Sequence, residues 1–158
     1  MKIEIGNYRF RFDLSIKKIV EVSGINSNTD DTMNKHILLW DFDNVRLNDV
    51  TSSLSKIQDY WKLPKIYIVQ SSKNRFHAYS FFEVDLSTAM AIISSTPLIC
   101  KTFFKMGVMR DYWTLRITPK KEGEKFNLVR VLPSPYRAKE RLDLVRMLET
   151  VKYKTEGH

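Results

Sequence analysis

Apolar and polar residues recur between positions 36 and 106 in a pattern that predicts alternating strands and helices. Asn48 and Asp85 are suited to cap helices, and Pro64 and Pro97 follow the two helical segments and end them. Within the first helix, apolar residues return every three or four positions, which is the helical period. The expected elements are a strand at 36–44, a helix at 48–61, strands at 65–71 and 75–84, a helix at 86–93 and a strand at 98–106.

This order is β-α-β-β-α-β, which predicts an α+β fold with a ferredoxin-like or RRM-like antiparallel sheet. The strands at 36–44 and 75–84 are then expected side by side in the middle of the sheet. Residues 1–35 are expected to form an N-terminal unit packed on a core of residues 36–158. The remaining expected elements are a hairpin at 3–14, a short helical or irregular piece at 15–22, a polar linker at 23–32, strands at 112–118 and 126–132, and a helix from Ser134 to Leu148.

Composition narrows the class of protein. The chain has 158 residues, 43% of them hydrophobic, which is enough for one domain with a core. The net charge of +8 favours a polyanionic partner, most commonly nucleic acid. Cys100 is the single cysteine, so the chain has neither an internal disulfide nor a zinc module of paired cysteines. No apolar run predicts a membrane span and the N-terminus lacks an apolar signal region, so we expect a cytoplasmic protein with no membrane partner.

Strand parity predicts a cluster of ionisable side chains on one sheet face. Side chains alternate across a strand, so Asp41 and Asp43 face one way. Arg75, His77 and Arg116 are expected to project from the same face. Two carboxylates two residues apart suit Mg²⁺ or Mn²⁺, because these ions take oxygen ligands and share them with phosphates. An adjacent imidazole or guanidinium suits a triphosphate.

These residues resemble the motifs of the archaeo-eukaryotic primase superfamily. Residues 37–43, Ile-Leu-Leu-Trp-Asp-Phe-Asp, are similar to its first motif, an apolar run leading into paired acids. Residues 71–77, from Ser71 to His77, resemble the second, in which a small polar residue precedes a phosphate-contacting histidine. Residues 115–121 resemble the basic stretch after the third motif in plasmid and phage primase-polymerases. The resemblance covers roughly residues 36–121.

The resemblance implies a metal-dependent nucleotidyltransferase that extends a nucleic-acid 3′-hydroxyl or makes primers. Asp41 and Asp43 would hold Mg²⁺ or Mn²⁺, and Ser71, His77, Arg116 and Lys120 would bind the nucleotide. The implied partners are a DNA template or primer, nucleoside triphosphates and a helicase or other replication protein, and the implied source is a virus or plasmid. At the third motif Cys100 stands where the family has an aspartate. Either Asp111 supplies a third catalytic carboxylate, or the site has only two.

Three other functions compete with this one. Rolling-circle initiators and relaxases share the sheet, but their metal is held by paired histidines, and the corresponding strand here has only His77. A phosphatase with an Asp-x-Asp nucleophile needs a larger parallel sheet. A non-catalytic RRM-like nucleic-acid binder is the main rival, because it would stack bases on exposed aromatics such as Tyr67, Tyr79 and Phe81.

Overall fold

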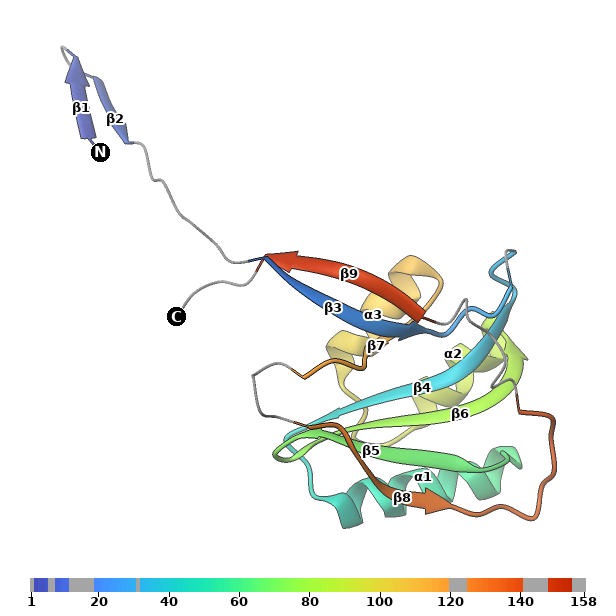
Figure 1. The fold of residues 1–158 in the computed structure, drawn as a ribbon. Coiled ribbons are helices and arrows are strands. Elements are labelled where there is room, and N and C mark those ends of the chain that lie inside the picture. Colours follow the sequence, from blue (N-terminus) through green and yellow to red (C-terminus); the bar gives the residue numbers. More distant parts are fainter. Residues whose placement is uncertain are drawn as a thin grey trace.

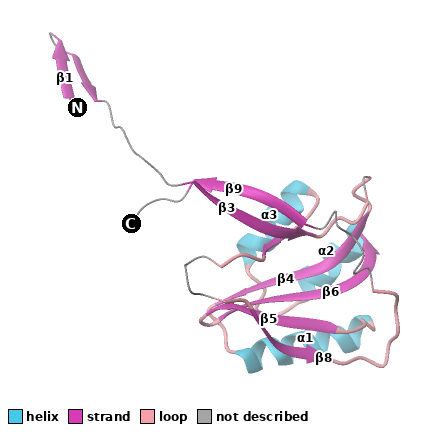
Figure 2. Ribbon diagram, viewed as in Figure 1, coloured by secondary structure: helices cyan, strands magenta, loops and turns pink. Residues whose placement is uncertain are grey.

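The computed structural model describes residues 2–5, 8–11, 19–30, 32–119, 125–140 and 148–154. Within them the protein is α+β, with antiparallel sheets and three helices (Figures 1 and 2). In chain order the elements are β1 (Lys2–Ile5), β2 (Tyr8–Arg11), β3 (Ile19–Asn26), β4 (Lys35–Asp43), α1 (Leu47–Trp61), β5 (Ile66–Ser72), β6 (Arg75–Asp85), α2 (Leu86–Ser95), α3 (Lys101–Arg110), β7 (Thr114–Arg116), β8 (Asn127–Leu132) and β9 (Leu148–Lys154).

The strands form three sheets. β1 pairs with β2, the strands β7, β3 and β9 form a second sheet in that order, and the largest sheet has the order β4-β6-β5-β8. The expected pairing of the strand at 36–44 with the strand at 75–84 is confirmed by β4 and β6. The expectation that both lie in the middle is wrong, because β4 is an edge strand of the four-stranded sheet. A ferredoxin-like order is therefore not established for this chain.

Both faces of β4 are covered, which accounts for its nearly continuous apolar sequence. Residues 36–40 and Phe42 are all fully buried. Trp40 faces the helices, since its indole N–H donates to Thr96 Oγ1 at the end of α2 over 2.9 Å. Ile37 and Leu39 face the opposite side, where β7 lies against β4. A strand buried on both faces lacks the alternation of a half-exposed strand.

Helices α1 and α2 begin and end close to the predicted positions. Val50, Leu54 and Ile57 form the buried stripe of α1, at the predicted helical spacing. Its N-cap is Arg46, so the prediction of Asn48 as the cap is wrong by two residues. Asp85 caps α2 as predicted, because its carboxylate accepts the Thr88 backbone N–H over 2.8 Å.

The strand predicted at 98–106 is wrong, since residues 101–110 form the helix α3. On this helix, Phe103 and Phe104 each lie about one turn before Gly107. The Phe104 ring stacks on Trp113, with ring centroids 6.3 Å apart. The adjacent phenylalanines raise β propensity locally, but packing against Trp113 selects the helical period. The fourth strand of the large sheet is instead β8, on the edge opposite β4.

The predicted C-terminal helix is also wrong in the part that the structure describes. Residues 133–140 are irregular, and Leu148 begins β9, which pairs with β3. Ser134 accepts the Tyr136 N–H as a helix cap would, but its hydroxyl also donates to the Leu63 carbonyl over 2.6 Å. That contact holds the segment to the end of α1 instead of starting a helix.

The N-terminal expectations are met in part. β1 and β2 confirm the pairing of a hairpin, while residues 6–7, expected to form its turn, and residues 12–18 lie outside the described part of the chain. Residues 19–26, expected to be a short helical or irregular piece followed by a linker, form β3 instead. The boundary between residues 35 and 36 stays a prediction. None of the described helices is long and apolar enough to cross a membrane.

Gly107 provides a test of the packing between α3 and Trp113. A Cβ atom added at Gly107 would overlap the indole ring of Trp113, which is almost fully buried and is held by a hydrogen bond to the Phe104 carbonyl. We expect Gly107→Ala to lower the free energy of unfolding by about 1–3 kcal/mol, against the usual gain from placing Ala in a helix. Urea unfolding measures this change. Met109→Ala, at a position 71% exposed on the same helix, should change stability little, and equal losses in both variants would contradict the packing explanation.

A buried histidine joins β3, β4 and β7. The Ser27 hydroxyl donates to His36 Nδ1 over 3.1 Å, and His36 Nε2–H donates to the Met33 carbonyl over 2.7 Å. The Trp113 backbone N–H donates to Ser27 Oγ over 2.9 Å. Burial lowers the pKa of His36, although its bond to Met33 and the charges of Asp30, Asp111 and Asp85 oppose the shift.

This lowered pKa predicts a loss of stability in mild acid. Below the ordinary histidine pKa of 6.5, the unfolded chain binds a proton that folded His36 resists, so the free energy of unfolding falls as the pH falls. We expect the urea midpoint to drop between pH about 7.5 and about 5.5 more steeply in the wild type than in His36→Gln, which does not titrate. Parallel pH profiles in the two proteins would show that other groups cause the loss.

Candidate active site

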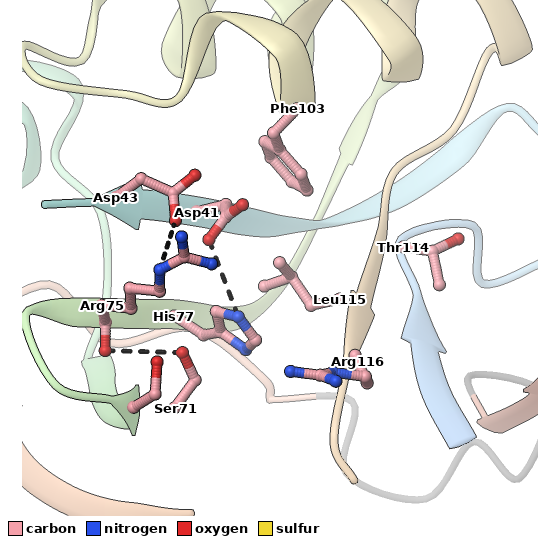
Figure 3. A pocket seen from close by; sticks show the side chains of 10 residues that line it. Asp41, Asp43, Ser71, Arg75, His77, Phe103, Thr114, Leu115 and Arg116 are labelled. Carbon is pink, nitrogen blue, oxygen red and sulfur yellow. Dashed lines mark hydrogen bonds and ion pairs between the residues drawn. The ribbon is translucent and has the colours of Figure 1, made fainter. Parts of the chain in front are cut away.

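The carboxylates of β4 lie directly opposite two basic side chains of β6. Asp41 pairs in register with His77, and Asp43 with Arg75. Opposite residues on antiparallel strands bring their side chains within contact. His77 Nε2 lies 3.6 Å from Asp41 Oδ1, and Arg75 Nε lies 3.4 Å from Asp43 Oδ1 (Figure 3). Strand parity therefore places two acids and two bases on one sheet face, as the sequence predicted for Asp41, Asp43, Arg75 and His77.

These four side chains line a cavity of about 230 Å³ (Figure 3). β5 contributes two hydroxyls, α3 an aromatic ring, and β7 crosses above the sheet with a guanidinium. Arg116 reaches from β7 toward His77 (Figure 3). The lining residues are Asp41, Asp43, Ser71, Ser72, Arg75, His77, Phe103, Thr114, Leu115 and Arg116.

His77 is the most buried ionisable group of the cavity, at 7% exposure, and its ring is held on the other edge by Tyr79. The Tyr79 hydroxyl lies 3.3 Å from His77 Nδ1. Burial, helped by the negative charge of Asp41, raises the pKa of Tyr79, so this hydroxyl stays protonated. When the hydroxyl donates a hydrogen bond to Nδ1, the other ring nitrogen, Nε2, carries the hydrogen that faces Asp41.

Cys100 lies against the two carboxylates. It is the N-cap of α3, and its backbone N–H donates to the Asp41 carbonyl over 2.8 Å. The Cys100 sulfur and one carboxylate oxygen each from Asp41 and Asp43 all lie within 4.8 Å of one another. Burial, together with its hydrogen bond to Asp43 and the charges of both aspartates, raises the pKa of the Cys100 thiol. The thiol of Cys100, where the resemblance implied an aspartate, lies beside Asp41 and Asp43.

These donors fit a divalent cation, with a distinct preference. Two carboxylates suit Mg²⁺ or Mn²⁺, but a thiol is a soft ligand that Mg²⁺ does not use. Asp41, Asp43 and Cys100 together favour a more thiophilic ion than three carboxylates would. A cation on Asp43 also competes with Arg75 for the same oxygen.

Most of the predicted site residues come together here. Asp41, Asp43, Ser71, His77 and Arg116 line one cavity. Asp111 does not lie there, because it is the C-cap of α3, at the opposite end of that helix from Cys100. A ten-residue helix places them about 15 Å apart. Lys120 lies outside the described residues.

The sequence interpretation did not assign site roles to five lining residues, Ser72, Arg75, Phe103, Thr114 and Leu115. Parity on its strand already placed Arg75 on the same face as His77, and that signal was sufficient to name it. Phe103 could not be found this way, because the segment was expected to be a strand and is a helix.

No protein-family model, curated protein or solved structure showed significant similarity to this chain. Its function therefore has to be inferred from its own side chains.

Competition between Arg75 and a cation yields a direct test of the site. We expect Arg75→Gln to raise the affinity for Mn²⁺ by at most about fivefold, because a half-exposed ion pair contributes little more than 1 kcal/mol. Electron paramagnetic resonance of free Mn²⁺ measures the binding. Lys73→Gln, in the exposed turn before β6, removes the same charge without touching Asp43. Equal gains in both variants would mean that only overall charge matters.

Proposed function

We propose that this cavity binds a nucleoside triphosphate with a divalent cation and transfers its nucleotide to the 3′-hydroxyl of a nucleic acid. The observation that carries the proposal is the meeting of Asp41 and Asp43 with His77 and Arg116 in one cavity. Phosphoryl transfer needs little covalent chemistry from the protein. It needs carboxylates that hold a cation, and cationic or hydrogen-bonding side chains that hold the phosphates. The net charge of +8 is consistent with a nucleic-acid partner.

In this function the chain's own residues position the reactants. Asp41 and Asp43 hold the cation, which neutralises charge on the phosphates when bound. His77 donates from Nε2 and Arg116 from its guanidinium to the triphosphate oxygens, and Ser71 lines the same cavity. Leu115 and Phe103 provide the apolar wall that limits water around them.

The reaction breaks a phosphoanhydride bond and forms a phosphate ester bond. The 3′-oxygen forms a bond to the α-phosphorus while the bond from that phosphorus to the bridging β-oxygen breaks. Pyrophosphate leaves with the electron pair of that bond, and the hydroxyl proton is lost to solvent. Primer synthesis uses the same exchange with the 3′-hydroxyl of a nucleotide. A helicase or other replication protein as partner stays part of this proposal.

Cys100 supports a second candidate, a nucleotide-binding protein without catalysis. Its thiol stands beside Asp41 and Asp43, where a third carboxylate would add charge for a hard cation. A site with two carboxylates can bind a nucleotide and still fail to activate the attacking hydroxyl. The stacking surface expected for an RRM-like binder receives less support, because Tyr79 is almost fully buried.

Primer extension separates the two candidates. Primed and unprimed DNA templates are incubated with labelled dNTPs or NTPs and with Mg²⁺ or Mn²⁺. We expect extension, faster with Mn²⁺ than with Mg²⁺ because of the thiol, and a loss of at least about 100-fold in Asp41→Asn/Asp43→Asn. The control is Asp59→Asn/Asp111→Asn, which makes the same charge change at two exposed positions away from the cavity.

Undiminished activity in Asp41→Asn/Asp43→Asn would contradict the assignment of Asp41 and Asp43. Loss in both double variants, reproduced by Asp111→Asn alone, would restore Asp111 as the third carboxylate. An absence of extension in the wild type, with nucleotide binding that depends on Asp41 and Asp43, would favour the non-catalytic candidate.

A further inference from the structure

A second cavity of about 330 Å³ adjoins the first along the same sheet face. Its lining is almost entirely apolar and includes four aromatic rings. The lining residues are Ile25, Tyr67, Val69, Tyr79, Phe81, Ile117, Phe126 and Leu128. Cavities of this size and character are typical of small-molecule sites.

Alternation along two strands makes the cavities neighbours. On β6, Arg75 and His77 line the first cavity and Tyr79 and Phe81 the second. On β5, Ser71 lines the first, and Val69 and Tyr67 follow in the second. Residues two apart point to the same face of a strand. One trough therefore runs along this face, with charged groups at one end and aromatic rings at the other.

His77 stands at the junction of the two cavities. In the sheet register it lies opposite Asp41 on β4 and opposite Val69 on β5. Its ring also contacts Phe126, with centroids 5.6 Å apart. Two strand spacings separate Asp41 from Val69, about 10 Å in all. This separation is comparable to that between the base and the phosphates of an extended nucleotide.

Aromatic rings make up half of the residues that line the second cavity. Tyr79 and Phe81 are nearly parallel, with an interplanar angle of 8° and centroids 6.1 Å apart. Phe126 closes the cavity from the segment before β8. The only polar side-chain groups among the lining residues are two tyrosine hydroxyls. Tyr79 engages His77, and Tyr67 engages Glu140 over 3.0 Å.

We propose that the second cavity is the base subsite of the nucleotide whose triphosphate lies in the first. This inference rests on the proposed function only for the identity of the ligand, and it does not require catalysis. A ligand that fills the trough needs a planar group for the aromatic end and phosphates for the charged end. A nucleoside triphosphate has both. Because both tyrosine hydroxyls are engaged, the subsite accepts every base and discriminates by stacking area, so it binds purines more tightly than pyrimidines.

Binding measured without nucleic acid tests this subsite. Isothermal titration with ATP and with inorganic tripolyphosphate, both in Ca²⁺ to prevent turnover, separates the base from the phosphates. We expect Phe126→Ala to weaken ATP roughly tenfold, as loss of one stacking ring does, and to leave tripolyphosphate unchanged. Tyr60→Ala removes an aromatic ring that is 78% exposed on α1, and should change neither affinity.

A measurement on the unaltered protein covers the case in which Phe126→Ala does not fold. Stacking should quench the fluorescence of 2-aminopurine riboside triphosphate, and ATP should bind more tightly than CTP. Equal wild-type affinities for ATP and tripolyphosphate, equal losses of both ligands in Phe126→Ala, or no quenching would each overturn the subsite.

The result is independent of the primer-extension assay. Base-dependent binding without extension would support the subsite and reject catalysis. Extension with ATP binding insensitive to Phe126 would reject the subsite and keep the proposed function.

Discussion

The antiparallel register between β4 and β6 is the constraint on which the site depends. It sets Asp41 against His77 and Asp43 against Arg75, on the sheet face opposite to the one that Trp40 presents to α2. A slip of β4 by one residue would turn Asp41 and Asp43 toward the helix-covered face and Trp40 and Phe42 toward the cavity. The observed register is therefore favoured, because the alternative would bury two carboxylates in the apolar core.

The same register makes burial of charge tolerable. A partly buried carboxylate is costly unless a partner compensates it, and here each aspartate has a basic neighbour on the adjacent strand. The compensation is modest, because the Asp43–Arg75 pair is more than one-third exposed on each side. Under the proposed function, an entering cation would exchange with these basic partners.

The edge position of β4 has a chemical consequence. An edge strand leaves backbone groups that other segments must bind. The Cys100 N–H binds the Asp41 carbonyl, and the Ile37 N–H binds the Ser27 carbonyl. The first of these contacts starts α3 beside the carboxylates, and so brings a thiol and the ring of Phe103 into the cavity. In a four-stranded order with β4 in the middle, another strand would occupy that edge.

The sequence by itself determined the local structure and the parity of the site. Apolar runs, helical periodicity and the residues that break helices and strands placed β4, α1, β5, β6 and α2 within a few residues of their observed ends, because these signals are local. Parity then put Asp41, Asp43, Arg75 and His77 on one face. Only the tertiary structure decided that residues 101–110 form a helix, since packing against Trp113 outweighed the β propensity of two phenylalanines. It likewise decided that β8 pairs with β5, that Asp111 lies at the far end of α3, and that Cys100 reaches the carboxylates, because long-range pairing leaves no periodic trace in the chain.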